Sequence, residues 1–198
     1  MEIIKHILLE MRIKQWTKNL FVYAAILFHG ELFNFDYFVT VSIIFIAFSL
    51  TASGIYFVND ILDIERDKLN PKKCQRPIAS NAISKSLGYF CACALINFGL
   101  FISYSINNIC FFLMLSYVIL NLLYSTWLKH FIIIDVMIIS YGFIIRTVIG
   151  AVAVDINMTT WFILCVMFLS LFLALGKRRC GISVIPPPLA VTQNLLIN

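Results

Sequence analysis

The sequence contains little charge: only 13% of its 198 residues are Asp, Glu, Lys or Arg, against roughly 25% in a soluble protein. Hydrophobic residues make up 61%, whereas soluble domains have about 45–50%. Apolar runs near the length of a membrane-spanning helix recur along the chain. These features exclude an ordinary soluble domain. Because lipid cannot satisfy the open edge of a sheet, they predict a helical membrane protein.

The sequence also lacks the cysteine patterns of metal sites and disulfide frameworks. Its six cysteines include no CxxC pair and no Cys/His ligand spacing. We therefore expect neither a zinc site nor a set of disulfides. The net charge of +5 is compatible with nucleic-acid binding. However, the basic residues cluster between apolar segments, which indicates a charged membrane face and no nucleic-acid partner.

Six apolar segments predict transmembrane helices, near residues 19–29, 38–62, 87–105, 108–126, 131–153 and 160–176. The first is short for a full span, so we expect it to be tilted or to begin nearer Gln15. Lys and Arg are absent from the connections near 29–36, 104–108 and 155–159. Fourteen of the fifteen Lys and Arg residues lie in the N-terminal segment, in 66–85, at Lys129 or in Lys177–Arg179. The positive-inside rule places these basic segments, and the N-terminus, in the cytoplasm.

The stretch YFVNDILDIERDKLNPKKCQRPIAS, residues 56–80, concentrates charge of both signs. Tyr56, Asn59, Asp60, Asp63 and Asp67 lie three or four residues from one another, which predicts one face of a helix. Carboxylates that share a face need a positive partner if they are buried. Since Mg²⁺ prefers oxygen ligands, we predict a metal site of Asn59, Asp60, Asp63 and Asp67, with the three aspartates catalytic.

The basic loop that follows these acids has the complementary charge. Lys72, Lys73 and Arg76 precede Pro77, which discourages continuation of the helix. Arg binds phosphate through two hydrogen bonds and Lys acts as a point charge. Acids for a metal beside bases for phosphate are the parts expected for a diphosphate–Mg²⁺ complex.

Other polar residues are predicted at the same face of the membrane. They are Arg12, Lys14 and Lys18 before the first segment, and Tyr124, Ser125 and Lys129 at the end of the fourth. Asp135 and Arg146 lie within the fifth segment. Arg146 follows Asp135 by eleven residues. At about 100° per residue, the two side chains point within about 20° of each other, so they share a helix face. An ionisable residue inside a span is a functional candidate by default.

Plainer interpretations remain open for several of these residues. The acids could end a solvated helix and pair with Arg66 and Lys68. Arg146 could make a polar contact between helices. Lys177, Arg178 and Arg179 could serve only to set the topology.

The motif NDILDIERD resembles the N-D-x-x-D-x-x-x-D signature of the UbiA superfamily of intramembrane prenyltransferases. Further stretches resemble one branch of it, the decaprenyl-phosphate phosphoribosyltransferases. They are MRIKQWTKNLFVYAAILF, KKCQRPIAS, LYSTWLKH, IDVMIISYGFIIRTVIGAVA and LFLALGKRR. The resemblance covers residues 11–179 and is most specific in KQWTKN, YSTWLK and GKRR. It implies an all-α, polytopic transmembrane bundle with about six of the nine spans of the family.

The resemblance implies a reaction, its partners and their location. The reaction is Mg²⁺-dependent transfer of 5-phosphoribose from phosphoribosyl diphosphate to a polyprenyl phosphate, with release of diphosphate. The setting is the lipid bilayer of a bacterial-type inner membrane, with the active site on the cytoplasmic side. The implied metal ligands are those named above. The implied substrate-binding residues are Lys18, Tyr56, Lys73, Arg76, Tyr124 and Lys129 for the sugar diphosphate, and Arg146, Lys177 and Arg178 for the lipid phosphate.

The sequence departs from the family pattern in two places. Asn81 stands where the family has glycine after RPIAS, and because Asn tolerates a left-handed backbone we expect the turn to survive. The family carries three further spans and a second aspartate-rich segment that these 198 residues do not contain. After Arg179 the resemblance stops. We therefore expect a UbiA-like domain over residues 1–179 and an unrelated tail over 180–198, as in a frameshifted or truncated product.

Three functions are compatible with the sequence. Phosphoribosyl transfer is favoured by KQWTKN together with YSTWLK. A UbiA-type enzyme that moves a prenyl group from a prenyl diphosphate to an aromatic acceptor would need the same acidic motif. A transporter or an inactive truncated remnant is the third possibility, favoured by the missing spans.

Overall fold

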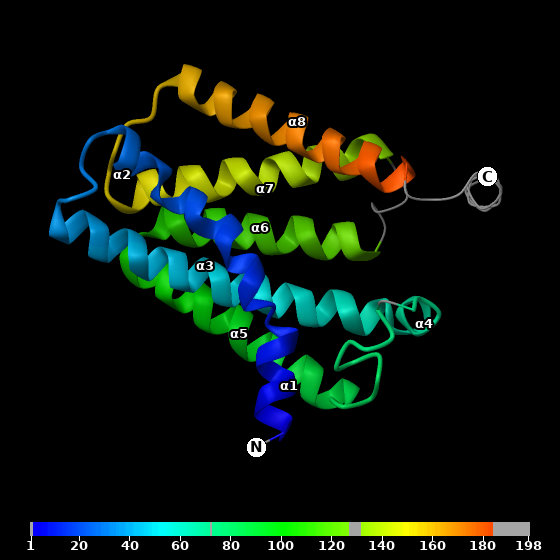
Figure 1. Ribbon diagram of the computed structural model, residues 1–198. Coiled ribbons are helices and arrows are strands. Elements are labelled where there is room, and N and C mark those ends of the chain that lie inside the picture. Colours follow the sequence, from blue (N-terminus) through cyan, green and yellow to red (C-terminus); the bar gives the residue numbers. More distant parts are fainter. Residues whose placement is uncertain (1, 72, 127–131, 184–198) are drawn as a thin grey trace.

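The computed structural model describes residues 2–71, 73–126 and 132–183, with side chains described for all of these except 132–133 and 177–183. The described residues form helices joined by turns (Figure 1). In chain order the helices are α1 (Glu2–Glu10), the 3-10 helix η1 (Ile13–Tyr23), α2 (Ala24–Phe28), α3 (Phe35–Leu62), α4 (Ile64–Lys68), α5 (Lys85–Ile106), α6 (Asn108–Thr126), α7 (Ile132–Ala153) and α8 (Thr160–Ser183). The all-α fold class is confirmed.

Within the described ranges, four helices are long and apolar enough to cross a membrane: α3, α5, α6 and residues Ile134–Ala153 of α7. The apolar part of α8, Thr160–Gly176, is slightly shorter. The side chains of Phe98, Phe112 and Phe172 are more than half exposed, as expected for helices that face lipid. Five of the six predicted segments therefore correspond to single long helices.

The first predicted segment, 19–29, has a different form. The chain winds as η1 from Ile13 and continues as the short helix α2 to Phe28. A 3-10 helix rises about 2.0 Å per residue instead of about 1.5 Å. The eleven residues of η1 and five of α2 therefore extend roughly 30 Å, about the thickness of the hydrocarbon core. The segment is long enough because it is stretched, and it begins even earlier than Gln15.

Close packing around α3 and α7 holds this stretched segment in the bundle. η1 lies against both helices, while α5 packs along α3 and α8 packs along α7 (Figure 1). At Gly150 of α7, a Cβ atom would lie only 1.9 Å from the carbonyl oxygen of Val22. Only glycine permits that approach, which brings the backbones of η1 and α7 into contact.

The two ends of the bundle differ in charge. In Figure 1 the connections after α2, α5 and α7 lie at its left end, and these are the ones that lack Lys and Arg. The loop between α4 and α5, which carries Arg76, lies at the opposite end. The alternation predicted from the sequence is therefore present in the fold.

The basic loop is attached to the bundle by its own small core. Ile78 and Ile83 of the loop are 1% exposed and pack with Phe57 and Ile61 of α3. Asn81 turns the loop with a φ of 60°, so the left-handed turn expected there is confirmed. These contacts place Arg76 beside the candidate residues Asp60 of α3 and Asp67 of α4.

Candidate active site

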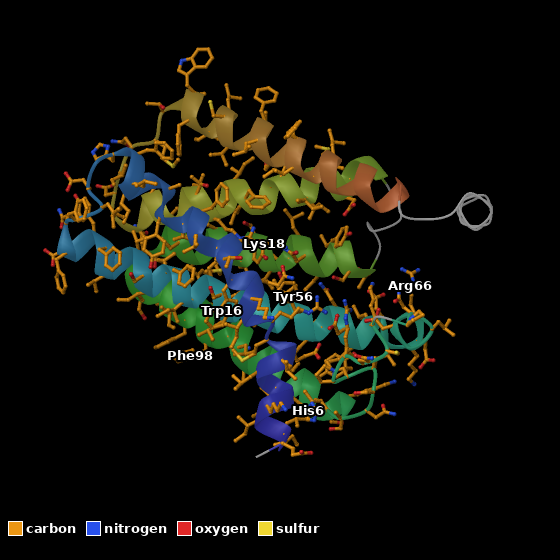
Figure 2. All side chains as sticks on the ribbon, viewed as in Figure 1. His6, Trp16, Lys18, Tyr56, Arg66 and Phe98 are labelled. Atoms are coloured by element: carbon orange, nitrogen blue, oxygen red, sulfur yellow. The ribbon has the colours of Figure 1, made fainter. Side chains whose placement is uncertain are left out.

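A cavity of about 420 Å³ lies among η1, α3, α6, α7 and α8. Most of its wall is apolar, from residues such as Ile55, Ile138 and Leu173. Its polar lining comprises Lys18, Tyr56, Asn59, Tyr117, Asn121, Tyr124, Asp135 and Arg146. Figure 2 shows Lys18 of η1 and Tyr56 of α3 in the middle of the bundle. The structure thus gathers five of the residues expected to bind substrate or metal: Lys18, Tyr56, Asn59, Tyr124 and Arg146.

A cluster of ion pairs lies next to this cavity, between α1, the end of α3, α4 and the basic loop. Arg76 Nη1 donates to Asp60 Oδ1 at 2.9 Å and to Asp67 Oδ2 at 2.6 Å. Lys73 Nζ lies 3.6 Å from Asp67 Oδ1, and Arg12 Nη2 bonds the second oxygen of Asp60. Asp60 and Asp67 are buried, at 4% and 1% exposure. We call these five residues the ion-pair cluster.

This arrangement does not match the alternative of a solvated helix end. Asp60 and Asp67 pair with Arg12, Lys73 and Arg76, while Lys68 pairs with the exposed Glu65 at 3.5 Å. Arg66 projects away at the outer end of the bundle (Figure 2). The partners of the buried acids are therefore largely the cations predicted to hold phosphate.

The prediction that residues 56–67 form one face of a single helix is wrong in one respect, because their side chains point to two different surroundings. α3 ends at Leu62 and Asp67 lies on α4, although backbone bonds from Asp63 N to Asn59 O and from Asp67 N to Asp63 O continue across the junction. Asn59 and Asp60 are adjacent, so their side chains diverge by about 100°. Asn59 faces the cavity, where Ser125 Oγ donates to its Oδ1, whereas Asp60 faces Arg12.

No three His, Cys, Asp or Glu side chains, within the ranges the structure describes, are grouped as a ready metal site. The donor chemistry of the predicted ligands still fits Mg²⁺, because all of them offer hard oxygen atoms. Asp67 Oδ1 is buried and accepts no hydrogen bond, although Lys73 lies near it. Mg²⁺ commonly binds through one or two carboxylates together with substrate phosphates. Asp67 therefore offers one such carboxylate beside Arg76, whereas the predicted ligand Asp60 bonds Arg12 and Arg76 through its two oxygens and Asn59 faces the cavity.

Arg146 makes the polar contact between helices that the sequence left open. Its Nε donates to Asn19 Oδ1 at 2.8 Å, its Nη1 to the carbonyl of Gly142 at 2.5 Å and its Nη2 to Tyr117 Oη at 3.2 Å. The guanidinium also lies 4.9 Å from the ring centroid of Phe48. It is 7% exposed, and among the described side chains no carboxylate forms a salt bridge with it. Its predicted role toward a lipid phosphate stays a prediction.

Asp135 and Tyr124 meet across α6 and α7. Tyr124 Oη donates to Asp135 Oδ1 at 2.6 Å, and both residues line the cavity. The expectation that Asp135 and Arg146 share a face is confirmed, since Arg146 lines the same cavity further along α7. Lys72 and Lys129 lie outside the described residues, as do the side chains of Lys177 and Arg178.

Sequence reasoning missed Glu10, the last residue of α1. Its side chain is 1% exposed, and no donor bonds either carboxylate oxygen. Burial, together with the neighbouring Asp60 carboxyl, raises the pKa of Glu10 to about 9, although the charges of Arg12 and Arg76 act in the opposite direction. The available signal was an acid directly after two leucines in an apolar helix.

The long apolar helices and the polar cavity between them define an integral membrane protein with a site for polar groups inside the bundle. The chain belongs to the UbiA prenyltransferase family, which matches residues 19–178. It is 40% identical over 172 residues to a decaprenyl-phosphate phosphoribosyltransferase of Mycolicibacterium smegmatis, covering 85% of this chain and 54% of that protein. A protein of that name from Corynebacterium glutamicum is 38% identical, with 87% and 53% covered.

The fold is also similar to a solved structure described for digeranylgeranylglyceryl phosphate synthase in membranes. The TM-score is 0.73 at 22% identity, and the match covers 90% of this chain and 62% of the other. At that identity the likeness supports the fold alone. The chain spans about half the length of the curated relatives it matches. The expected tail over 180–198 lies beyond the family match, and its part from 184 on is outside the described residues.

Proposed function

We propose that the chain forms the N-terminal part of an enzyme that transfers 5-phosphoribose from 5-phosphoribosyl 1-diphosphate to a polyprenyl phosphate. The observation that carries the proposal is the 36–40% identity to relatives named decaprenyl-phosphate phosphoribosyltransferase, over 85% or more of this chain. The cavity and the ion-pair cluster support it, because they place hydrogen-bonding groups beside acids and bases suited to a diphosphate.

In the proposed reaction, an oxygen of the lipid phosphate forms a bond to C1 of the ribose. The bond from C1 to the diphosphate breaks, and the electron pair leaves with the diphosphate. Arg76 and Lys73 stabilise the charge that grows on this leaving group. Asn59, Asp63 and Asp67 would hold Mg²⁺, which neutralises diphosphate charge when bound. The acceptor is already an oxyanion, so no proton has to be removed from it.

The proposed setting is the inner membrane of a bacterial-type cell. The basic loop, the N-terminus and the mouth of the site lie on the cytoplasmic side, because the opposite connections carry no Lys or Arg. Phosphoribosyl diphosphate then arrives from the cytoplasm and the polyprenyl phosphate from the bilayer.

Asp63→Asn tests the proposal. In membranes that contain the chain, with and without the C-terminal spans of its relatives, labelled phosphoribosyl diphosphate and polyprenyl phosphate are supplied. We expect the variant to lose at least about 100-fold of the lipid-linked label, as when one stabilising group is removed from a transition state. Glu65→Gln is the control, because Glu65 is exposed on α4 and pairs with Lys68, which is not part of the cluster. Undiminished transfer by Asp63→Asn would refute the role of that residue.

The same membranes, supplied in a parallel reaction with a prenyl diphosphate and an aromatic acid, separate the alternatives. The family match is equally consistent with a prenyl group moving from a prenyl diphosphate to an aromatic acceptor. A prenylated aromatic product without labelled lipid would favour that reaction. Absence of both products with the added spans present would favour an inactive remnant.

A further inference from the structure

Asp135 is an acidic side chain in a cavity whose wall is mostly apolar. It lies in the first turn of α7, and Ile138, Ile139 and Leu173 line the cavity around it. Tyr124 Oη donates to Asp135 Oδ1 at 2.6 Å. Burying an acid among apolar groups is costly unless hydrogen-bond donors meet it. Asp135 is half-buried and accepts from Tyr124, so a ligand that enters the cavity beside it is stabilised if it also donates a hydrogen bond.

The place of Asp135 along the bundle is the same as that of the candidate metal ligands. Asn59 is three residues from the end of α3, Tyr124 is two residues from the end of α6, and Asp135 is three residues after the start of α7. All three line the cavity at the end of the bundle that carries the basic loop. Arg146 is about 16 Å further along α7. A diphosphate at Asn59 would thus have its attached group close to Asp135.

The chemistry of Asp135 discriminates between the two classes of donor. An ionised carboxylate accepts up to about four hydrogen bonds and donates none. A pentose attached to the diphosphate presents hydroxyl donors, whereas a prenyl chain presents none. Beside a prenyl chain the carboxylate would lose water and gain no hydrogen bond from the ligand. A stabilising acid at a helix N-terminus would explain its place on α7, but not its direction toward Tyr124 and the cavity.

We propose that Asp135, oriented by Tyr124, accepts hydrogen bonds from the ribose hydroxyl groups of the donor and so selects a pentose diphosphate over a prenyl diphosphate. The inference rests on the proposed function, since it concerns the donor of that reaction. It assigns Asp135 to specificity for the sugar. It assigns Tyr124 to the positioning of the carboxylate.

Binding measurements on the 198-residue chain in nanodiscs with Mg²⁺ test this assignment. The ligands are phosphoribosyl diphosphate, its 2-deoxy and 3-deoxy analogues, inorganic diphosphate and a prenyl diphosphate. The parent should bind the ribose compound about 10- to 100-fold more tightly than at least one deoxy analogue, as for a hydrogen bond to a charged group. Asp135→Asn should abolish most of that ratio and leave the affinity for inorganic diphosphate unchanged.

Two further variants keep the test decisive. Asp155→Asn is the matched control, because Asp155 is an exposed acid just beyond the other end of α7 and should retain the full ratio. Tyr124→Phe keeps the ring and removes only the hydroxyl group, so it should lower the same ratio even if Asp135→Asn fails to fold. A purely structural role would shift the affinity for all ligands alike.

The outcomes separate this inference from the proposed function. Tight binding of phosphoribosyl diphosphate with an unchanged ratio in both variants would overturn the role of Asp135 and leave the proposed function standing. Tight binding of the prenyl diphosphate, without binding of the ribose compound, would overturn both. A parent chain that binds none of the ligands would also overturn the assignment.

Discussion

Replacing Glu10 with glutamine should stabilise the protein and remove part of its pH dependence. Glu10 is 1% exposed beside Asp60, and burial together with that neighbour raises its pKa from 4.5 to about 9. In a metal-free buffer at neutral pH, the folded protein therefore holds a proton on Glu10 that the unfolded chain releases. Glutamine is neutral at every pH, so it removes the ionisation of position 10 beside Asp60 while keeping a side chain of similar size.

The direction and size follow from linkage. Below about pH 4.5 both states are protonated, so Glu10 costs nothing. As the pH rises from there toward 9, each unit removes about 1.4 kcal/mol of stability. By pH 7 the parent has lost about 3 kcal/mol that Glu10→Gln retains. For a chain of this size that is a difference in Tm of roughly 6–12 °C.

The measurement is thermal unfolding of the detergent-solubilised chain with EDTA, followed by circular dichroism from pH 4.5 to 8.5. The Tm of Glu10→Gln should match the parent at the acid end and exceed it progressively above. Glu2→Gln, an exposed acid on the same helix, should track the parent at every pH. Parallel curves for the parent and Glu10→Gln would show that Glu10 is ionised in the folded state, and the reasoning would fail.

Two other changes test the packing and the ion-pair cluster. Gly150→Ala should destabilise the bundle by about 1–3 kcal/mol, because its Cβ would overlap the Val22 carbonyl, whereas Gly176→Ala, with nothing within 4 Å, should be neutral or stabilising. Equal melting temperatures for the two variants would contradict the close contact of η1 and α7. Arg76→Gln leaves two buried carboxylates without their shared partner and should lower the free energy of unfolding by about 3 kcal/mol. Lys68→Gln breaks only an exposed pair and should cost less than about 1 kcal/mol, so a similar loss in both variants would refute the importance of burial.

The long helices, and the end of the bundle that carries the basic loop, could be predicted because they depend on composition and on counts of Lys and Arg. The left-handed turn at Asn81 was also predictable, since few residues adopt that conformation. The first crossing was not predictable in detail. Its stretched winding depends on the contact between Val22 and Gly150, which are distant in the sequence.

The sequence could predict which residues form the candidate site, but not which neighbour each of them contacts. The spacing of the acids placed Asn59 and Asp60 on one stripe, and only the neighbours decide that one faces Ser125 and the other Arg12. Glu10 escaped attention because its one local signal, the two leucines before it, does not tell whether the acid is buried or faces solvent. Such choices are made by tertiary contacts, which helical periodicity does not record.

Arg12, the residue just before η1, is subject to two opposing demands. Arg12 has a left-handed backbone, with φ 52° and ψ 49°, which costs a residue with a Cβ about 1–2 kcal/mol. Its guanidinium also bonds Asp60 and lies 4.9 Å from the ring centroid of Tyr56. Glycine would ease the turn but abolish both contacts, while any other charged residue would keep the backbone cost. The backbone turn between α1 and η1 and the positive charge beside Asp60 therefore both depend on residue 12. A substitution that improves one of them changes the other as well.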